Sequence, residues 1–306
     1  MKKTIFYLAL SFVAVSCYID SNDNNSNDDS NEETAVIPKK VVRINEDYYI
    51  TETDYEAVNG KVQTITQTKS YKNGEVYEKK QTTITYENNL PISEKTINLL
   101  NNKTVQEISY EYVAGKLVKS VSKIEEADKP AEVETKTYKY EGNNLKESIS
   151  IKQSSNSTIK EDKNFNYISD TEIEVLKTTS YNMPPSVHRD TTTYTLDSNK
   201  RIIKSLSRLE GGRWTKLYQY DNKNNYKKIP LFITTNPEYF INRELTQNNL
   251  FHYKLNVQQY DVPDRQFHEE QYNEYQYNDK DYPIIVNGVD KDDSGTEYHY
   301  KIEVTY

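Results

Sequence analysis

The residue types that most often carry protein chemistry are few in this chain, and they do not fall into a catalytic spacing. There is one cysteine, and the four histidines are His188, His252, His268 and His299. His268 begins a His-Glu-Glu string, but Tyr272 stands where a zinc-binding helix motif needs its second histidine. Nucleophile-elbow, phosphate-loop and dinucleotide-binding motifs are also absent from the sequence. We therefore predict a protein that is not an enzyme and has no cofactor.

One string near the C-terminus has the spacing of a calcium-binding loop. Asp290, Asp292 and Ser294 stand where such a loop places its first ligands, and Gly295 follows at the sixth position. The twelfth position is Lys301, where the loop needs a bidentate glutamate. Because Asp-Ser-Gly is also an ordinary hairpin turn, we favour a turn and keep a calcium site as the alternative.

Aromatic residues are the other candidates for binding, since the chain has 28 tyrosines and a single tryptophan. The candidate ligand contacts are Trp214, Tyr218, Tyr220, Tyr275 and Tyr277. Exposed rings of this kind can form a platform that stacks on the flat face of a sugar. The alternative, which we favour for most of the tyrosines, is packing, with the ring in the core and the hydroxyl toward water.

A repeated unit positions these tyrosines. A tyrosine before a turn recurs about every 27 residues, which indicates a repeat architecture. The positions are Tyr86, Tyr112, Tyr140, Tyr167, Tyr194 and Tyr220, with Tyr277 about two periods later. Each unit is a strand ending in Tyr-x-Tyr, a turn rich in Asn, Asp and Gly, and a second alternating strand, which is the pattern of a β-hairpin. The expected fold is all-β: a repeated antiparallel β-hairpin meander that forms one large curved sheet, half-barrel or barrel-like.

Two features qualify this sheet. Residues 222–249 break the repeat and contain Pro230 and Pro237, so they predict an irregular excursion, with room for a short helix, that caps one end of the sheet. Charged residues such as Lys119 and Lys204 also stand mid-strand among apolar ones. A lipid-facing strand needs an uninterrupted apolar outward face. We therefore expect a water-soluble sheet and not a pore.

The N-terminal residues predict where in the cell the protein is located. Residues 1–16 have the layout of a signal peptide, with two lysines followed by an apolar run too short to span a bilayer. Cys17 follows small residues, as in the bacterial lipoprotein signal, which this segment resembles. That resemblance implies lipidation of Cys17 and anchoring to a membrane. Residues 17–38 contain acidic side chains and no basic ones before Lys39, so we expect a disordered tether.

Composition limits the remaining classes. The net charge of −8 argues against nucleic-acid binding, which needs a basic surface. Only 35% of the residues are hydrophobic, and tyrosine makes up much of that share. Residues 39–306 are therefore expected to form a single repetitive β domain with a thin aliphatic core.

Taken together, the lipoprotein signal, the acidic tether and the tyrosine-rich hairpins resemble an uncharacterised family of Bacteroidota lipoproteins with a porin-like β fold. The units YQYDNKNN and YKYEGNNLKES are also similar to the tyrosine–aspartate repeats of Rhs-like proteins, which build long curled sheets. This resemblance implies a fold and a location at the outer membrane. It does not imply a catalytic activity or a ligand. Acidic residues close to Cys17 are similar to a surface-export signal, so the cell surface is expected, with the periplasmic face as the alternative.

The function expected from these features is a lipid-anchored envelope protein. We predict a non-catalytic binding module for a glycan, a peptide or an envelope partner. The alternatives are a purely structural envelope lipoprotein, or a carrier of lipid or another hydrophobic molecule. The low content of aliphatic residues argues against the carrier function.

Overall fold

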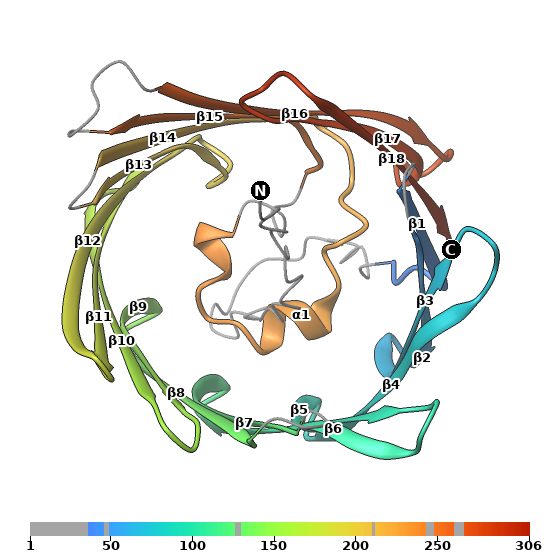
Figure 1. The fold of residues 1–306 in the computed structure, drawn as a ribbon, viewed down its shortest axis with the longest axis horizontal. Coiled ribbons are helices and arrows are strands. Elements are labelled where there is room, and N and C mark those ends of the chain that lie inside the picture. The colour runs from blue at the N-terminus through green and yellow to red at the C-terminus, as the bar shows by residue number, and fades with distance from the viewer. Residues whose placement is uncertain (1–35, 46–48, 126–129, 210–211, 243–247, 260–265) are drawn as a thin grey trace, which may run out of the picture.

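The chain forms a closed β-barrel in the computed structural model (Figure 1). The structure describes residues 36–45, 49–125, 130–209, 212–242, 248–259 and 266–306. The predicted signal peptide, Cys17 and nearly all of the predicted tether lie outside these residues. No helix among the described residues is long and apolar enough to cross a membrane.

Eighteen strands make up the barrel wall. Their bounds are β1 Lys40–Asn45, β2 Tyr49–Val58, β3 Lys61–Tyr71, β4 Val76–Glu87, β5 Leu90–Asn98, β6 Lys103–Val113, β7 Lys116–Ile124, β8 Glu132–Glu141, β9 Asn144–Gln153, β10 Thr158–Ser169, β11 Glu172–Asn182, β12 Pro185–Leu196, β13 Ile202–Leu209, β14 Gly212–Tyr220, β15 Leu250–Gln259, β16 Gln266–Tyr277, β17 Pro283–Lys291 and β18 Glu297–Thr305. Two short helices, α1 (Pro230–Thr234) and the 3₁₀ turn η1 (Tyr239–Ile241), lie between β14 and β15. The all-β meander predicted from the repeat is confirmed.

The open or half-closed sheet left possible by the sequence is corrected, because the sheet closes completely. Each strand pairs antiparallel with its neighbours in the chain, and β1 pairs with both β2 and β18. The closing pair runs in register from Lys40 opposite Thr305 to Asn45 opposite Tyr300. Closure leaves no unpaired edge, so the backbone hydrogen bonds of the first and last strands are satisfied within the chain.

Side chains alternate between the lumen and the outer surface along each strand. On the outer surface, oppositely charged residues face each other across neighbouring strands. Lys95 on β5 stands opposite Glu107 on β6 at 2.9 Å, and Lys254 on β15 stands opposite Glu270 on β16 at the same distance. The outer face of the wall is therefore charged at mid-strand.

The recurring tyrosine has a structural role that explains the repeat. In two of the hairpins its hydroxyl reaches across to the preceding hairpin and donates to a backbone carbonyl just after the turn. Tyr86 donates to Val62 at 2.8 Å, and Tyr140 donates to Leu117 at 2.9 Å. The residues that follow the turns are nearly inaccessible, at 1% exposure for Val62 and Leu117. At these two places, one phenol and one buried aliphatic side chain tie a hairpin to the next. Other recurring tyrosines bond to the segment between β14 and β15, as Tyr112 donates to the Thr234 carbonyl at 3.5 Å.

All of these tyrosine-bearing turns lie at one end of the barrel, which we call the insert end. The chain leaves this end after β14 and returns to it before β15, and residues 221–249 between them are called the insert. Figure 1 shows α1 and η1 inside the ring of strands. The irregular excursion expected at one end of the sheet packs inside the barrel at that end, where Glu238 contacts Lys163 of β10 (Thr158–Ser169). The opposite end, where the β3–β4 and β17–β18 turns lie, is called the far end.

Candidate functional site: a charged cup in the barrel lumen

The insert crosses the lumen and packs against strands that are distant from it in sequence. Ile229 and Leu231, at 1% and 4% exposure, lie in one apolar cluster with Ile84 of β4. Farther along, Phe240 of η1 packs edge-on against Phe165 of β10, with ring centroids 5.6 Å apart. The insert therefore covers the inner wall from β3 to β10.

A second group of residues fixes where the insert leaves and re-enters the wall. The Asp221 carboxylate accepts hydrogen bonds from the Asn249 backbone N–H at 3.0 Å and from the Tyr277 hydroxyl. Arg201 donates to the Asn248 side-chain oxygen at 2.8 Å and is paired with Asp197 at 2.7 Å. These bonds join the two ends of the insert to the β12–β13 turn, to β16 and to each other, so the insert is held at its root.

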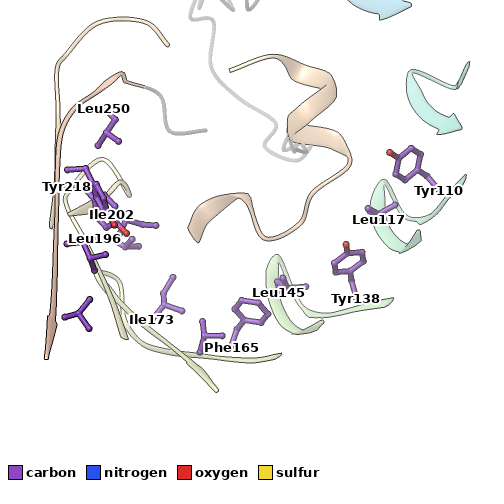
Figure 2. Close-up of a cluster of buried hydrophobic side chains, with 14 residues drawn as sticks. Tyr110, Leu117, Tyr138, Leu145, Phe165, Ile173, Leu196, Ile202, Tyr218 and Leu250 are labelled. Atoms are coloured by element: carbon purple, nitrogen blue, oxygen red, sulfur yellow. The ribbon is translucent and has the colours of Figure 1, made fainter. Parts of the chain in front are cut away.

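The inner wall beside the insert is apolar. Figure 2 shows side chains from successive hairpins following the curve of the wall and facing the insert, among them Leu117, Leu145, Phe165 and Leu250. The apolar cluster continues from β6 to β15. The core of this protein is thus a shell between the insert and the wall at the insert end.

Beyond the insert, the lumen holds a cavity of about 650 Å³. We call it the cup. Its floor is formed by four residues of the insert: Phe232, Thr235, Asn236 and Glu238. Its wall is formed by inward-facing residues of β3 to β10, which include Lys69, Glu78, Lys80, Thr82, Glu94, Thr96, Gln106, Ile108, Tyr110, Ser122, Glu134, Lys136, Glu161 and Lys163. The floor belongs to the insert and the wall to eight strands, so the cup exists only in the folded barrel.

Most of the charges in the cup are paired. Glu78 lies 2.9 Å from Lys69 and 3.0 Å from Lys80. Burial alone would raise the pKa of Glu78, but the hydrogen bonds from these two lysines outweigh it and hold the pKa below its ordinary value. Glu134 is paired in the same way with Lys136 at 3.4 Å.

One ion cluster ties the floor to the wall. Lys163 of β10 lies 2.7 Å from Glu238 of the insert and 3.1 Å from Glu161. Ser148 of β9 also donates to Glu238, at 2.6 Å. Burial by itself would lower the pKa of Lys163, but the charges of Glu238 and Glu161 outweigh it and raise that pKa. The lysine therefore stays charged and anchors the floor.

Glu94 is different from the other cup carboxylates. In register it lies between Ile84 of β4 and Ile108 of β6. The Tyr110 hydroxyl donates to its Oε1 at 2.7 Å, and no basic side chain of the described residues forms an ion pair with it. Burial raises the pKa of Glu94, and the hydrogen bond from Tyr110 offsets only part of that rise.

Aromatic side chains gather where the cup approaches the far end. Tyr49 of β2 stands opposite Tyr71 of β3, and the ring of Tyr71 lies 4.7 Å from that of Tyr77. Their exposures are 38%, 48% and 40%. Tyr71 shares the inward face with Lys69, and Tyr77 directly precedes Glu78, so both adjoin charged residues of the cup. We call Tyr49, Tyr71 and Tyr77 the mouth cluster.

The structure places the aromatic residues predicted from the sequence on the inner wall, and it does not bring all five together. Tyr218 is buried and stacks on Tyr253 with centroids 5.6 Å apart. The Tyr275 hydroxyl donates to the Leu250 carbonyl at 2.7 Å. Tyr220 lies beside Arg201, whose guanidinium carbon is 5.3 Å from the ring centroid, and Tyr277 donates to Asp221.

Trp214 lies apart from these tyrosines, toward the far end of β14. It stands opposite Ser207 of β13 and Val257 of β15, and it is 38% exposed. Alternation along β14 gives it the same inward face as Tyr218. Of the predicted ligand contacts, Trp214 is thus an exposed ring near the far end, while the four tyrosines surround the root of the insert.

The calcium-like string forms the turn between β17 and β18. The Asp292 carboxylate accepts hydrogen bonds from the Ser294 backbone at 3.0 Å and the Thr296 backbone at 2.9 Å. Asp290 lies within β17, opposite Gln271 of β16. Within the ranges that the structure describes, no group of three His, Cys, Asp or Glu residues could hold a metal ion. Cys17, the predicted lipidation site, lies outside those ranges.

The residues that build the cup were not predicted from the sequence. Glu94, Tyr110 and Lys163 are spread over three strands, and only the closed barrel brings them to one cavity with Glu238. One signal was available: glutamate and lysine recur two residues apart on inward-facing positions, as in Glu78-Lys79-Lys80 and Glu134-Thr135-Lys136. A charged inner face of this kind indicates a wet lumen.

Comparisons with known proteins find similarity to solved structures only. No protein-family model matches the chain, and no curated protein matches it. A porin-like protein from Bacteroides uniformis is 12% identical, with a TM-score of 0.45, over 88% of this chain and 96% of that one. A porin-like protein from Bacteroides vulgatus is 13% identical, with a TM-score of 0.45, over 88% and 98%. A TcdB2-TccC3-Cdc42 structure is 14% identical, with a TM-score of 0.26, over 81% of this chain and 14% of that one.

Proposed function

We propose that this protein is a non-catalytic receptor that binds the end of a glycan chain in the cup. The observation that carries the proposal is the cup itself: a cavity of about 650 Å³ with a floor, a polar wall and the mouth cluster beside it. Ligand sites commonly combine aromatic surface with a few placed polar groups. The exposed rings supply faces on which a sugar can stack, and the paired charges supply donors and acceptors for its hydroxyl groups.

The chemistry of the wall favours a glycan over a lipid. An acyl chain in the cup would have to displace water from the ion pairs of Lys69, Glu134 and Lys163 without replacing its hydrogen bonds. A sugar hydroxyl can replace those bonds. The carrier function is therefore disfavoured, and the purely structural envelope role remains the second candidate because the insert is bonded so extensively to the wall.

We also propose that the barrel stands in water beside a membrane and is anchored through Cys17. The signal layout of residues 1–16 and the position of Cys17 support an outer-membrane lipoprotein, at the cell surface or on the periplasmic face. The charged outer face supports a water-soluble barrel, since Lys95 and Lys254 with their acidic partners would be costly to place in lipid. The insert also stands in the way of a channel.

A binding experiment tests the receptor function. The purified full chain is screened by saturation-transfer difference NMR against soluble oligosaccharides and against peptides of similar size. We expect an oligosaccharide to bind, and Tyr71→Ala to weaken that binding about five- to tenfold because it removes one stacking ring. Tyr272→Ala is the matched control, because Tyr272 is also exposed (44%) but stands on the outer face.

Three results would contradict the proposal. Binding of peptides in place of oligosaccharides would change the ligand class. Equal losses in the Tyr71 and Tyr272 variants would remove the mouth cluster from the site. Steady conductance in planar lipid bilayers would show a pore instead of a closed cup.

A further inference from the structure

The charges of the cup are balanced everywhere except at one place. Glu78, Glu134, Glu161 and Glu238 each have a lysine within 4 Å. Glu94 has Tyr110 as its hydrogen-bond donor and forms no ion pair with any described residue. Charged groups taken out of water are ordinarily paired, so an unpaired one that lines a cavity marks a candidate binding site.

The wall around Glu94 is neutral. Its register neighbours are Ile84 and Ile108, which cannot hydrogen-bond to it. Two residues farther along the same face, Thr96 shares a hydrogen bond of 2.8 Å with Thr82. Glu94 is thus a single negative charge set in a wall of aliphatic and hydroxyl side chains.

Tyr110 fixes the position of this charge. Its hydroxyl donates to Glu94 Oε1 at 2.7 Å, and Tyr110 is itself only 8% exposed. The carboxylate is therefore held by Oε1, and among the described residues its Oε2 has no bonded partner.

We propose that Glu94 binds a primary ammonium group on the ligand that enters the cup. This inference rests on the proposed glycan receptor, and it makes the ligand a glycan whose terminal sugar carries a free amino group. An ammonium group supplies the missing positive charge and donates three hydrogen bonds. Glu94 Oε2 accepts one of them, and the hydroxyls of Thr82 and Thr96 are neutral acceptors on the same wall.

The test compares two sugars that differ in a single group. Glucosamine and glucose are titrated separately into the full chain by isothermal calorimetry at neutral pH. We expect glucosamine to bind at least tenfold more tightly than glucose, because a hydrogen bond between charged groups is stronger than a neutral one. In Glu94→Gln, which keeps an acceptor for Tyr110, the two sugars are expected to bind alike.

Glu107→Gln is the matched control. It removes the same charge from the adjacent strand, but Glu107 faces outward and is paired with Lys95. We expect this variant to keep the preference for glucosamine. If Glu94→Gln does not fold, the comparison of the two sugars on the wild-type chain decides the matter.

Each outcome has one meaning. Equal affinity of wild type for the two sugars would overturn the ammonium site and leave the glycan receptor standing. A preference for glucosamine that survives Glu94→Gln would place the amine elsewhere and also overturn it. Failure of both sugars, together with failure of the oligosaccharide screen, would overturn the receptor and the ammonium site together.

Discussion

The two ends of the lumen are lined by the same strands and yet by different chemistry. On β10, Phe165 faces the insert and is 3% exposed, whereas Lys163, two residues earlier on the same face, belongs to the cup and is ion-paired. On β6, buried Tyr110 lies two residues from Ile108 and four from Gln106 in the cup. Along these strands, the inward-facing residues are mostly apolar where the insert covers them and mostly polar or charged where it does not.

This comparison shows how a barrel with little aliphatic material can be stable. Apolar residues are concentrated where the insert excludes water. Each Å² of apolar surface buried there stabilises the fold by about 25 cal/mol. Beyond the insert, many of the inward-facing residues are charged, and most of these charges are ion-paired. The insert therefore divides the lumen into an apolar core and a polar cavity.

The largest expected effect on the free energy of unfolding comes from a substitution in the apolar core between the insert and the wall. Ile229→Ala removes a side chain that is 1% exposed and packs against Val62 and Ile84. We expect the free energy of unfolding to fall by about 2–4 kcal/mol, through lost burial and the cavity left behind. Urea unfolding followed by circular dichroism measures it. Ile203→Ala, on the outer face at 38% exposure, is the control, and an equal loss in both variants would mean that the insert is not part of the core.

A smaller effect on the free energy of unfolding is expected for a substitution at the contact between the floor of the cup and its wall. Glu238→Ala leaves Lys163 without its closest partner and Ser148 without its acceptor. We expect a loss of about 1–2 kcal/mol, below that of a fully buried pair because both side chains keep some exposure.

A double-mutant cycle with Lys163→Met isolates the coupling between floor and wall. The outward pair of Lys254 and Glu270 provides the comparison, and Glu270→Ala is expected to change the free energy of unfolding much less. Additive effects of Glu238→Ala and Lys163→Met would contradict an ion pair that holds the floor.

The tyrosines that join the hairpins predict a third, smaller loss. Tyr140→Phe removes the hydroxyl that donates to the Leu117 carbonyl at 2.9 Å and leaves the ring in place. We expect a loss of about 1 kcal/mol in urea unfolding. Tyr272→Phe, whose exposed hydroxyl donates to Glu270, is expected to lose less. The reverse order would mean that the recurring tyrosine contributes through its ring alone.

These differences also show what could and could not be predicted from the sequence. The hairpins followed from local signals, since turns such as Asn88-Asn89 adopt the positive φ angles that tight hairpins need. Closure depends on β1 meeting β18, which no local pattern records. The inward face was also obscured by a β-bulge: the register shifts between Glu111 and Tyr112, so Leu117 and Ser120 both line the lumen although their spacing is odd.

The cup could not be predicted for a related reason. Its charges follow a local pattern, but which of them lack a partner depends on neighbours across the strands. Glu94 is unpaired because Ile84 and Ile108 flank it, whereas Glu161 is close to both Lys163 and Lys177. That contrast appears only when the register is known.

The same contrast predicts opposite responses to pH, with the smallest expected effects. Burial raises the pKa of Glu94 in the folded state, so the fold loses stability as pH rises from the ordinary carboxyl value through that raised pKa. Glu94→Gln removes this loss. It is therefore expected to melt at a higher temperature than wild type at pH 7, and the difference should vanish near pH 4, where the wild-type carboxyl is protonated.

Glu161 should respond with the opposite sign. Burial opposes its charge, but Lys163 and Lys177 outweigh it and lower the pKa, so the stability it contributes is present above the ordinary carboxyl value and is lost as pH falls through the lowered one. Glu161→Gln is expected to melt below wild type at pH 7 and to approach it in acid. Melting curves of the two variants and wild type between pH 7 and pH 3 measure both effects. Shifts of the same sign would mean that Glu94 has a cationic partner after all, and the distinction between the paired and unpaired carboxylates of the cup would fail.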